Sequence, residues 1–205
     1  MPQERRIPLS RRSHIIGFQA LPNGTASHES ALERHFVTLT SFSNPAAIIP
    51  SQPVTIAFDD EGFRRRYTPD FLVTYPTSAE LVEVKYESDL KAQWKRLDPA
   101  FHAAYQWAAA HNATFRVMTE RDIRGGLLNN AKRLLPLRTL PLDAKTAMLA
   151  LTHAHTLSPA TFRTLLAALP NRSLALATLW RLIAREQLHT DLSALITMDS
   201  ELRPA

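Results

Sequence analysis

The pattern of apolar and polar positions changes along this chain of 205 residues. Its first two thirds combine helix-type spacing of apolar residues with short runs of β-branched and aromatic residues, as in a mixed α/β domain. The last third has helix-type spacing and ends in a short alternating stretch. The expected helices are 27–41, 87–97, 99–110, 121–135 with an interruption near Gly125-Gly126, 142–155, 158–169 and 173–187, and the expected strands are 54–58, 67–75, 80–85 and 114–118.

The two middle strands predict a β-hairpin that carries charge, with residues 76–79 as its loop. Asp70 lies in the first strand, and Glu83 and Lys85 lie in the second. This loop would pair residue 72 with Glu83 and Asp70 with Lys85. Because side chains alternate across a strand, all three charged residues would then share one face, which a register slip of one residue would prevent. The hairpin is therefore expected to gather two carboxylates and one ammonium group.

Such a trio suits metal-dependent hydrolysis of a phosphodiester. Mg²⁺ prefers oxygen ligands, keeps several waters and contacts substrate phosphates. It lowers the pKa of a bound water and neutralises charge in the transition state, and a neighbouring lysine can orient that water or stabilise the developing charge. The alternative is an exposed hairpin with one cross-strand ion pair. The pattern by itself does not decide between these two interpretations.

Pro69-Asp70 followed by Glu83-Val84-Lys85 resembles the PD-(D/E)xK nuclease signature, here in the form PD-x12-ExK. Over roughly residues 25–135 the chain is similar to TnsA, the endonuclease subunit of heteromeric, Tn-seven-like transposases. Gln stands in the best-known TnsA at the position of Glu83, whereas this chain has the carboxylate usual in the superfamily. The segments that carry the resemblance, in the same order, are Ser30–Phe36, Gln52–Val54, Tyr67–Phe71 and Leu81–Lys85.

The resemblance implies a fold and a set of roles. The fold would be a restriction-endonuclease-like core with the order αβββαβ and a mixed sheet, in which the last strand is added parallel after a helical crossover. Asp70 and Glu83 would hold Mg²⁺, with two ions expected and Mn²⁺ able to substitute. The Val84 carbonyl would assist them, and Lys85 would position the attacking water.

In this superfamily the first helix commonly supplies a further acidic residue to the metal site. Glu33 is the better match to the TnsA pattern, and Glu29 is the reserve. Ser30-x-x-Glu33 is also the pattern of a capping box, in which Glu33 would bond the start of its own helix. We favour the metal role for Glu33 because of the rest of the motif.

The resemblance also implies an activity and partners. The protein would cut the strand ending 5′ at the transposon boundary in double-stranded DNA, while a DDE-type partner transposase (TnsB) cuts and joins the 3′ end. It would also contact an AAA+ ATPase regulator (TnsC). Two alternatives are a standalone nuclease of the same superfamily in restriction or repair, and a catalytically silent DNA-binding or assembly subunit.

Composition limits the other possibilities. The chain has a net charge of +5 and a pI of about 9.9, which favours a polyanionic partner such as nucleic acid. It contains no cysteine, which excludes disulfides and thiolate zinc sites. No apolar run long enough for a membrane span and no Gly-rich phosphate loop is visible. A soluble protein of the bacterial cytoplasm is expected, without membrane contact and without nucleotide hydrolysis of its own.

Prolines and short polar gaps that break the pattern predict three segments: a basic N-terminal arm over 1–26, the nuclease domain over 27–136, and a small domain over 141–205. The arm contains Arg5, Arg6, Arg11 and Arg12, and either phosphate contact or a solvated terminus fits it. In the nuclease domain, Arg65 and Arg66 belong to a run, Arg64–Arg66, that precedes the motif and could contact DNA phosphates.

The small domain is expected to be winged-helix-like. Its three helices are followed by an alternating stretch, 188–202, that would form the wing. The third helix would be the recognition element, with Arg172, Arg181 and Arg185 as candidate DNA contacts. A protein-docking module is the alternative, and both remain open. His153 and His155 have no carboxylate or third ligand near them in sequence and are interpreted as ordinary helix residues.

Overall fold

The computed structural model describes residues 17–21 and 23–205, which form two compact units divided between Ile123 and Arg124. The division precedes the boundary expected at 136–141, because the helix over Gly126–Leu134 packs within the second unit. The four arginines expected in the N-terminal arm lie outside the described residues. None of the described helices combines the length and apolar character that crossing a membrane would require.

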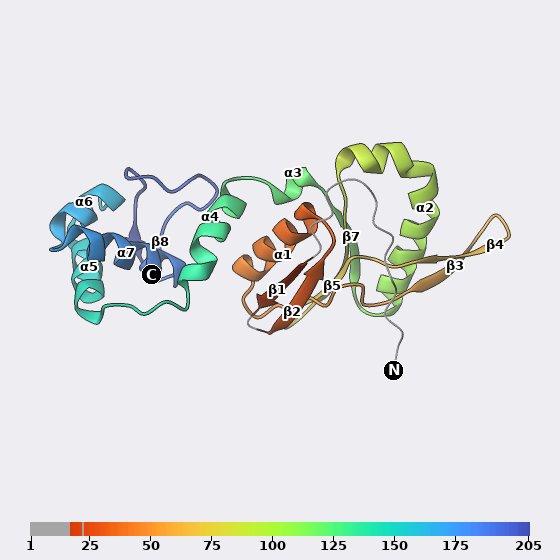
Figure 1. The fold of residues 1–205 in the computed structure, drawn as a ribbon, viewed down its shortest axis with the longest axis horizontal. Helices are drawn as coiled ribbons and strands as arrows, with labels where there is room; N and C mark the ends of the chain where they lie inside the picture. The colour runs from red at the N-terminus through yellow and green to blue at the C-terminus, as the bar shows by residue number, and fades with distance from the viewer. Residues whose placement is uncertain (1–16, 22) are drawn as a thin grey trace. The chain divides into compact units, whose positions relative to one another are not determined.

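The first unit is built on a mixed sheet in the order β5-β6-β7 (Figure 1). These strands span Phe71–Thr74, Ala79–Val84 and Thr114–Met118. β5 and β6 are antiparallel, and β7 runs parallel to β6, as the sequence predicted for a strand that follows a helical crossover. Segment 48–51 extends the sheet beyond β5 through two isolated bridges. The result is a mixed α/β unit.

The hairpin register differs from the prediction by two residues. Leu72 pairs with Leu81 rather than with residue 83, and Tyr75 N–H donates to the Ser78 carbonyl at 2.8 Å. The loop is therefore Pro76-Thr77 and not 76–79; proline at the first central position of a β-turn allows this tighter connection. Since the shift is two residues and side chains alternate with period two, every residue keeps the predicted face.

Helices cover both faces of this sheet. Phe36 of α1 (Ala31–Ser43) lies against Phe71, with ring centroids 5.2 Å apart. On the other face Leu81 packs with Ala104 and Ala108 of α2 (Glu87–Ala110).

α1 begins later than expected because a hairpin precedes it. β1 (Gly17–Leu21) and β2 (Gly24–His28) pair antiparallel where the sequence predicted an arm and the start of the helix. Ser30 is the N-cap of α1. Apolar and polar residues alternate only weakly in this segment, so the sequence pattern did not predict these two strands.

α2 is one helix where two were expected. Pro99 lies inside it, and the ribbon bends along its length (Figure 1). Proline removes one backbone hydrogen bond and clashes with the preceding turn, so it kinks the helix here instead of ending it. Phe101, Ala104 and Ala108 of this helix are buried, whereas Tyr105 is 64% exposed.

A second hairpin projects beside α2 and does not join the main sheet (Figure 1). It consists of β3 (Ile56–Asp60) and β4 (Phe63–Tyr67). Its turn is only Glu61-Gly62, both with positive φ, and Asp59 and Asp60 belong to β3. The strand predicted over 54–58 is therefore a ribbon strand and not a strand of the core sheet.

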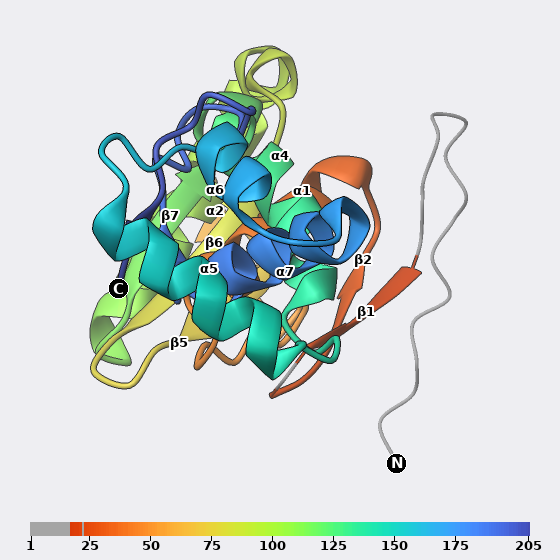
Figure 2. The same ribbon diagram turned by 90° about the vertical axis from the view of Figure 1, so that its left-hand side faces the viewer.

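The second unit is helical. The interruption predicted at Gly125-Gly126 separates α3 from α4, and three further helices appear where the pattern placed them. Figures 1 and 2 show α5, α6 and α7, which pack on one another through buried side chains such as Leu165, Leu179 and Leu182. The bounds are α3 Glu120–Ile123 (the end of the first unit), α4 Gly126–Leu134, a 3-10 turn Leu135–Leu137, α5 Ala144–Thr156, α6 Phe162–Ala168 and α7 Arg172–Ala184.

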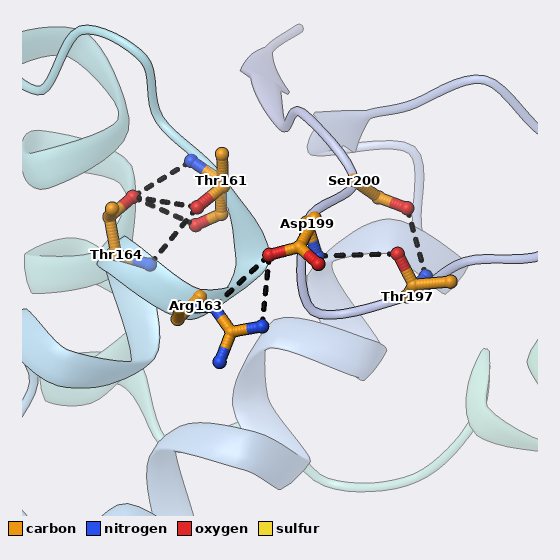
Figure 3. A network of polar contacts seen from close by, with 6 residues as sticks. All are labelled: Thr161, Arg163, Thr164, Thr197, Asp199 and Ser200. Carbon is orange, nitrogen blue, oxygen red and sulfur yellow. Dashed lines mark hydrogen bonds and ion pairs between the residues drawn. The ribbon is translucent and has the colours of Figure 1, made fainter.

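The stretch expected to form a wing, 188–202, is mostly loop. Its one strand, β8 (Leu188–His189), pairs with β9 (Arg203–Pro204) at the end of the chain, and Glu201 forms an isolated bridge with Thr161. Figure 3 shows how the loop is fastened: Arg163 donates to the Asp199 carboxylate at 2.9 and 3.1 Å, next to the Thr161–Thr164 capping box of α6. Side-chain contacts of this kind replace the strand ladder that alternation predicted.

Candidate active site

Asp70 is held at the start of β5 by contacts on both sides. Its carbonyl accepts a hydrogen bond from Gln52 N–H at 2.7 Å. Its carboxylate Oδ2 accepts one from Val84 N–H, also at 2.7 Å. The second bond links the aspartate directly to the glutamate-bearing strand, because Val84 follows Glu83.

Glu83 points from β6 toward the α2 side of the sheet and is only 4% exposed. Both carboxylate oxygens are engaged: Oε1 lies 2.7 Å from Lys85 Nζ, and Oε2 accepts a hydrogen bond from the Tyr67 hydroxyl at 2.7 Å. A buried carboxylate needs such partners, because burying an uncompensated charge is costly. The structure thus brings together the three residues that the hairpin was expected to gather, and adds a tyrosine.

The electrostatics of this site favour an additional positive charge. Burial raises the pKa of the Asp70 carboxyl well above its usual range, and the negative charges of Glu83 and Glu33 raise it further. Burial lowers the pKa of Lys85, but the ion pair with Glu83 outweighs this and leaves the pKa raised. Lys85 is therefore cationic at neutral pH, while Asp70 is short of cationic neighbours. A divalent cation would relieve that shortage.

Glu33 is close to this site but is engaged in its own helix start. Its Oε2 accepts a hydrogen bond from Glu29 N–H at 2.7 Å, and its own N–H donates to the Ser30 hydroxyl at 3.1 Å. The capping box that competed with the metal role is thus only half formed, because the Glu33 carboxylate bonds the N–H of Glu29 and not that of the N-cap Ser30. Burial raises the pKa of Glu33, and the carboxylate is near enough to raise that of Asp70. Glu29 instead accepts a hydrogen bond from the Gln52 side chain at 2.5 Å.

The donors present fit Mg²⁺ through two carboxylates. Within residues 17–21 and 23–205, no group of three or more His, Cys, Asp or Glu side chains is arranged as a ready metal site, so Glu33 does not complete a set with Asp70 and Glu83. Mg²⁺ needs no such cage, since it keeps several waters and is commonly held by one or two carboxylates and substrate phosphate. Whether the Val84 carbonyl and Glu33 take part stays a prediction.

A cavity of about 420 Å³ opens beside the buried pair. It lies between the β3–β4 hairpin and the first half of α2. Arg65 and Arg66, two of the predicted DNA contacts, line it, whereas Arg64 does not. Strand alternation by itself would group Arg64 with Arg66, so it does not explain this lining. The full lining is Phe58, Arg65, Arg66, Tyr67, Glu83, Lys85, Arg96, Leu97 and Ala100.

The arginines of α7 that were predicted as DNA contacts have different surroundings. Arg172 is exposed at the start of α7, and Arg181 is partly buried. Arg185 donates to the carbonyls of Arg138 and Leu140 at 3.1 and 2.6 Å, which fastens the end of α7 to the preceding loop. Arg185 thus has a structural role, and the DNA roles of Arg172 and Arg181 stay predictions.

Sequence reasoning missed two residues of the site. Tyr67 stands next to the motif but received no role, although a tyrosine on the same face as a buried glutamate is a natural hydrogen-bond donor. Arg96 lies in α2, and no local signal distinguishes it from Lys91 or Lys95. Only the packing of α2 on the sheet brings it to the cavity.

Comparison with known families agrees with this geometry. Residues 47–120 match the family described as TnsA-like endonuclease N terminal, a range that contains Asp70, Glu83 and Lys85. No curated protein matches the chain. The matched range begins at the segment that pairs with β5 and ends just beyond β7, so it covers the whole sheet that carries the site. This match supports a TnsA-type nuclease of the PD-(D/E)xK superfamily.

Proposed function

We propose that this protein is a metal-dependent DNA endonuclease that cleaves the strand ending 5′ at transposon ends, acting with a partner transposase in cut-and-paste transposition. The observation that carries the proposal is the convergence of Asp70, Glu83 and Lys85 on one face of the hairpin within a TnsA-like domain. An exposed hairpin with a single ion pair would not bury its glutamate beneath a tyrosine hydroxyl.

Asp70 and Glu83 are the residues that would hold Mg²⁺, with the Val84 carbonyl and Glu33 as further candidates. The metal, when bound, lowers the pKa of a coordinated water and neutralises charge on the phosphate. Lys85 Nζ lies 2.7 Å from Glu83 and so is fixed beside that carboxylate, where it can orient the attacking water. Tyr67 fixes the other oxygen of Glu83. The water oxygen attacks phosphorus and gives up a proton, one P–O ester bond breaks, and the leaving oxygen takes up a proton, so that the products are a phosphomonoester and a hydroxyl.

The partners follow from the family and not from the site. A TnsB-type DDE transposase would process the 3′ end, and a TnsC-type AAA+ ATPase would regulate the assembly. Arg65 and Arg66 would contribute to binding of double-stranded DNA near the cut, and Arg172 and Arg181 would do so from the second unit. A bacterial cytoplasmic location fits this role.

Cleavage at a mapped transposon end tests the proposal. The full chain is mixed with a TnsB-type transposase, a TnsC-type ATPase, a supercoiled plasmid carrying both ends, and Mg²⁺ or Mn²⁺. We expect 5′-strand cuts with the wild type and none with Asp70→Ala. Asp98→Ala, at an exposed position in α2, serves as the matched control and should cut normally.

Calorimetric titration of Mn²⁺ completes the test. Asp70-dependent metal binding together with Asp70-dependent cutting supports the proposal. Absence of both, with all partners present, would show a catalytically silent subunit. Cutting by the chain alone on DNA without transposon ends would show a standalone nuclease.

A further inference from the structure

The cavity beside Glu83 combines cations from three separate elements. Arg65 and Arg66 come from β4, Lys85 follows β6, and Arg96 comes from the first half of α2. Glu83 is the one acidic residue in the lining. The lining thus holds four cationic side chains and one anionic side chain, which is complementary to an anion and not to a neutral ligand.

Two of these cations are already committed. Lys85 pairs with Glu83 at 2.7 Å, and Arg65 pairs with Asp60 at 2.6 Å. Among the described residues neither Arg66 nor Arg96 forms an ion pair with a carboxylate; the Arg96 guanidinium contacts the Gln93 side chain. Arg96 is near enough to the site that its charge opposes protonation of Lys85. Two guanidinium groups are therefore available to bind an anion beside Glu83 and Lys85.

We propose that this cavity binds a backbone phosphate adjacent to the scissile one, with Arg66 and Arg96 as its ligands. Arginine suits this role because its planar group donates two parallel hydrogen bonds to phosphate oxygens. Arg96 then becomes a substrate-binding residue that holds the strand beside Glu83 and Lys85. The proposal rests on the nuclease function proposed above and adds a residue from α2 to its DNA-binding surface.

A contact with a flanking phosphate affects the salt dependence of DNA binding, whereas a purely catalytic contact affects the reaction rate. Each phosphate contact that a protein makes with duplex DNA contributes about 0.9 to the slope of log K against log salt concentration. Loss of Arg96 should lower that slope by about one and weaken binding about tenfold, equally for unrelated sequences. Because the flanking phosphate is bound similarly before and during reaction, KM should rise while kcat stays nearly constant.

The experiment measures duplex DNA binding by fluorescence anisotropy over a range of salt concentrations, in chelator, so that no cutting occurs. The full chain is compared with Arg96→Gln, Arg66→Gln and Lys95→Gln. Lys95 is the matched control because it is the neighbouring cation of α2, is exposed, and does not line the cavity. We expect a reduced slope for the two arginine variants alone, and retention of the slope in Arg96→Lys.

The outcomes separate this inference from the proposed function. A slope for Arg96→Gln equal to that of Lys95→Gln would overturn the phosphate site, even if the protein cuts DNA. A fall in kcat with unchanged KM would also overturn it, because Arg96 would then act on the reacting phosphate itself. If cleavage does not depend on Asp70, the proposed nuclease function is refuted. The salt slopes still test the phosphate site in that case.

Discussion

Replacement of Lys85 by methionine tests how much of the stability of the site depends on its buried ion pair. Lys85 Nζ lies 2.7 Å from Glu83, and the two side chains are 23% and 5% exposed. Lys91 provides a matched control on α2: its Nζ lies 2.8 Å from Glu87, but its side chain is 73% exposed. The two pairs have nearly the same length and differ in burial.

The expected magnitude follows from that difference. Removing one partner of a fully buried pair costs about 3–5 kcal/mol, because the other charge is left uncompensated. Lys85 is partly solvated and Glu83 keeps its bond from Tyr67, so we expect Lys85→Met to lower the free energy of unfolding by about 2–3 kcal/mol. Lys91→Met should cause no measurable loss, since an exposed pair is screened by water.

Urea unfolding followed by tryptophan fluorescence measures both variants, and Trp94 and Trp107 lie on α2 within the same unit as the site. With a typical slope of about 1.5 kcal/mol per molar urea, the midpoint of Lys85→Met should fall by about 1.5 M. The pKa of Lys85 is raised above its ordinary 10.5, so the stabilisation is fully present below that value. The gap between wild type and variant should therefore be constant from pH 7 to 9 and shrink only as pH rises through the raised pKa.

Equal losses for the two lysine variants would refute the reasoning, because burial would then not set the strength of the pair. A gap that already closes between pH 7 and 9 would also refute it, since Lys85 would not be the cation assumed. A change in the urea slope would indicate an altered native or unfolded state and would require a second variant, Lys85→Gln, for the comparison.

Further predictions concern the aspartate, the tyrosine and a close packing contact. In chelator, Asp70→Asn should be more stable than wild type by a margin that grows as pH rises above 3.8, the ordinary pKa of this carboxyl. Burial raises its pKa in the folded state, so its ionisation destabilises the fold; thermal unfolding measures this, and a margin that does not change with pH would contradict it. Tyr67→Phe should lose about 1.5–3 kcal/mol in urea unfolding, the typical value for a hydrogen bond to a charged group, and a loss below 0.5 would contradict the bond to the buried glutamate. Gly126→Ala should be destabilising by more than about 1 kcal/mol, although alanine favours helices, because its Cβ would lie 1.9 Å from the Ser193 carbonyl oxygen; an unchanged midpoint would show that the loop yields.

The sequence determined which charged residues share one face of the hairpin, but not which contacts join them. Alternation with period two put Asp70 and Glu83 on one side for any register that differs by an even number of residues. That is why the prediction survived a loop two residues shorter than expected. The parallel addition of β7 likewise followed from chain order and the handedness of crossovers.

Tertiary structure decided what lies above that face. Arg96 reaches the cavity because α2 continues through Pro99 and packs across the sheet, which helix propensity could not reveal. The last stretch of the chain alternates like a wing, yet Asn130, far away in sequence, donates to the carbonyls of Leu192 and Ala194 and holds it as a loop. Local pattern fixes the side to which a side chain points, whereas long-range hydrogen bonds and packing fix which groups meet there.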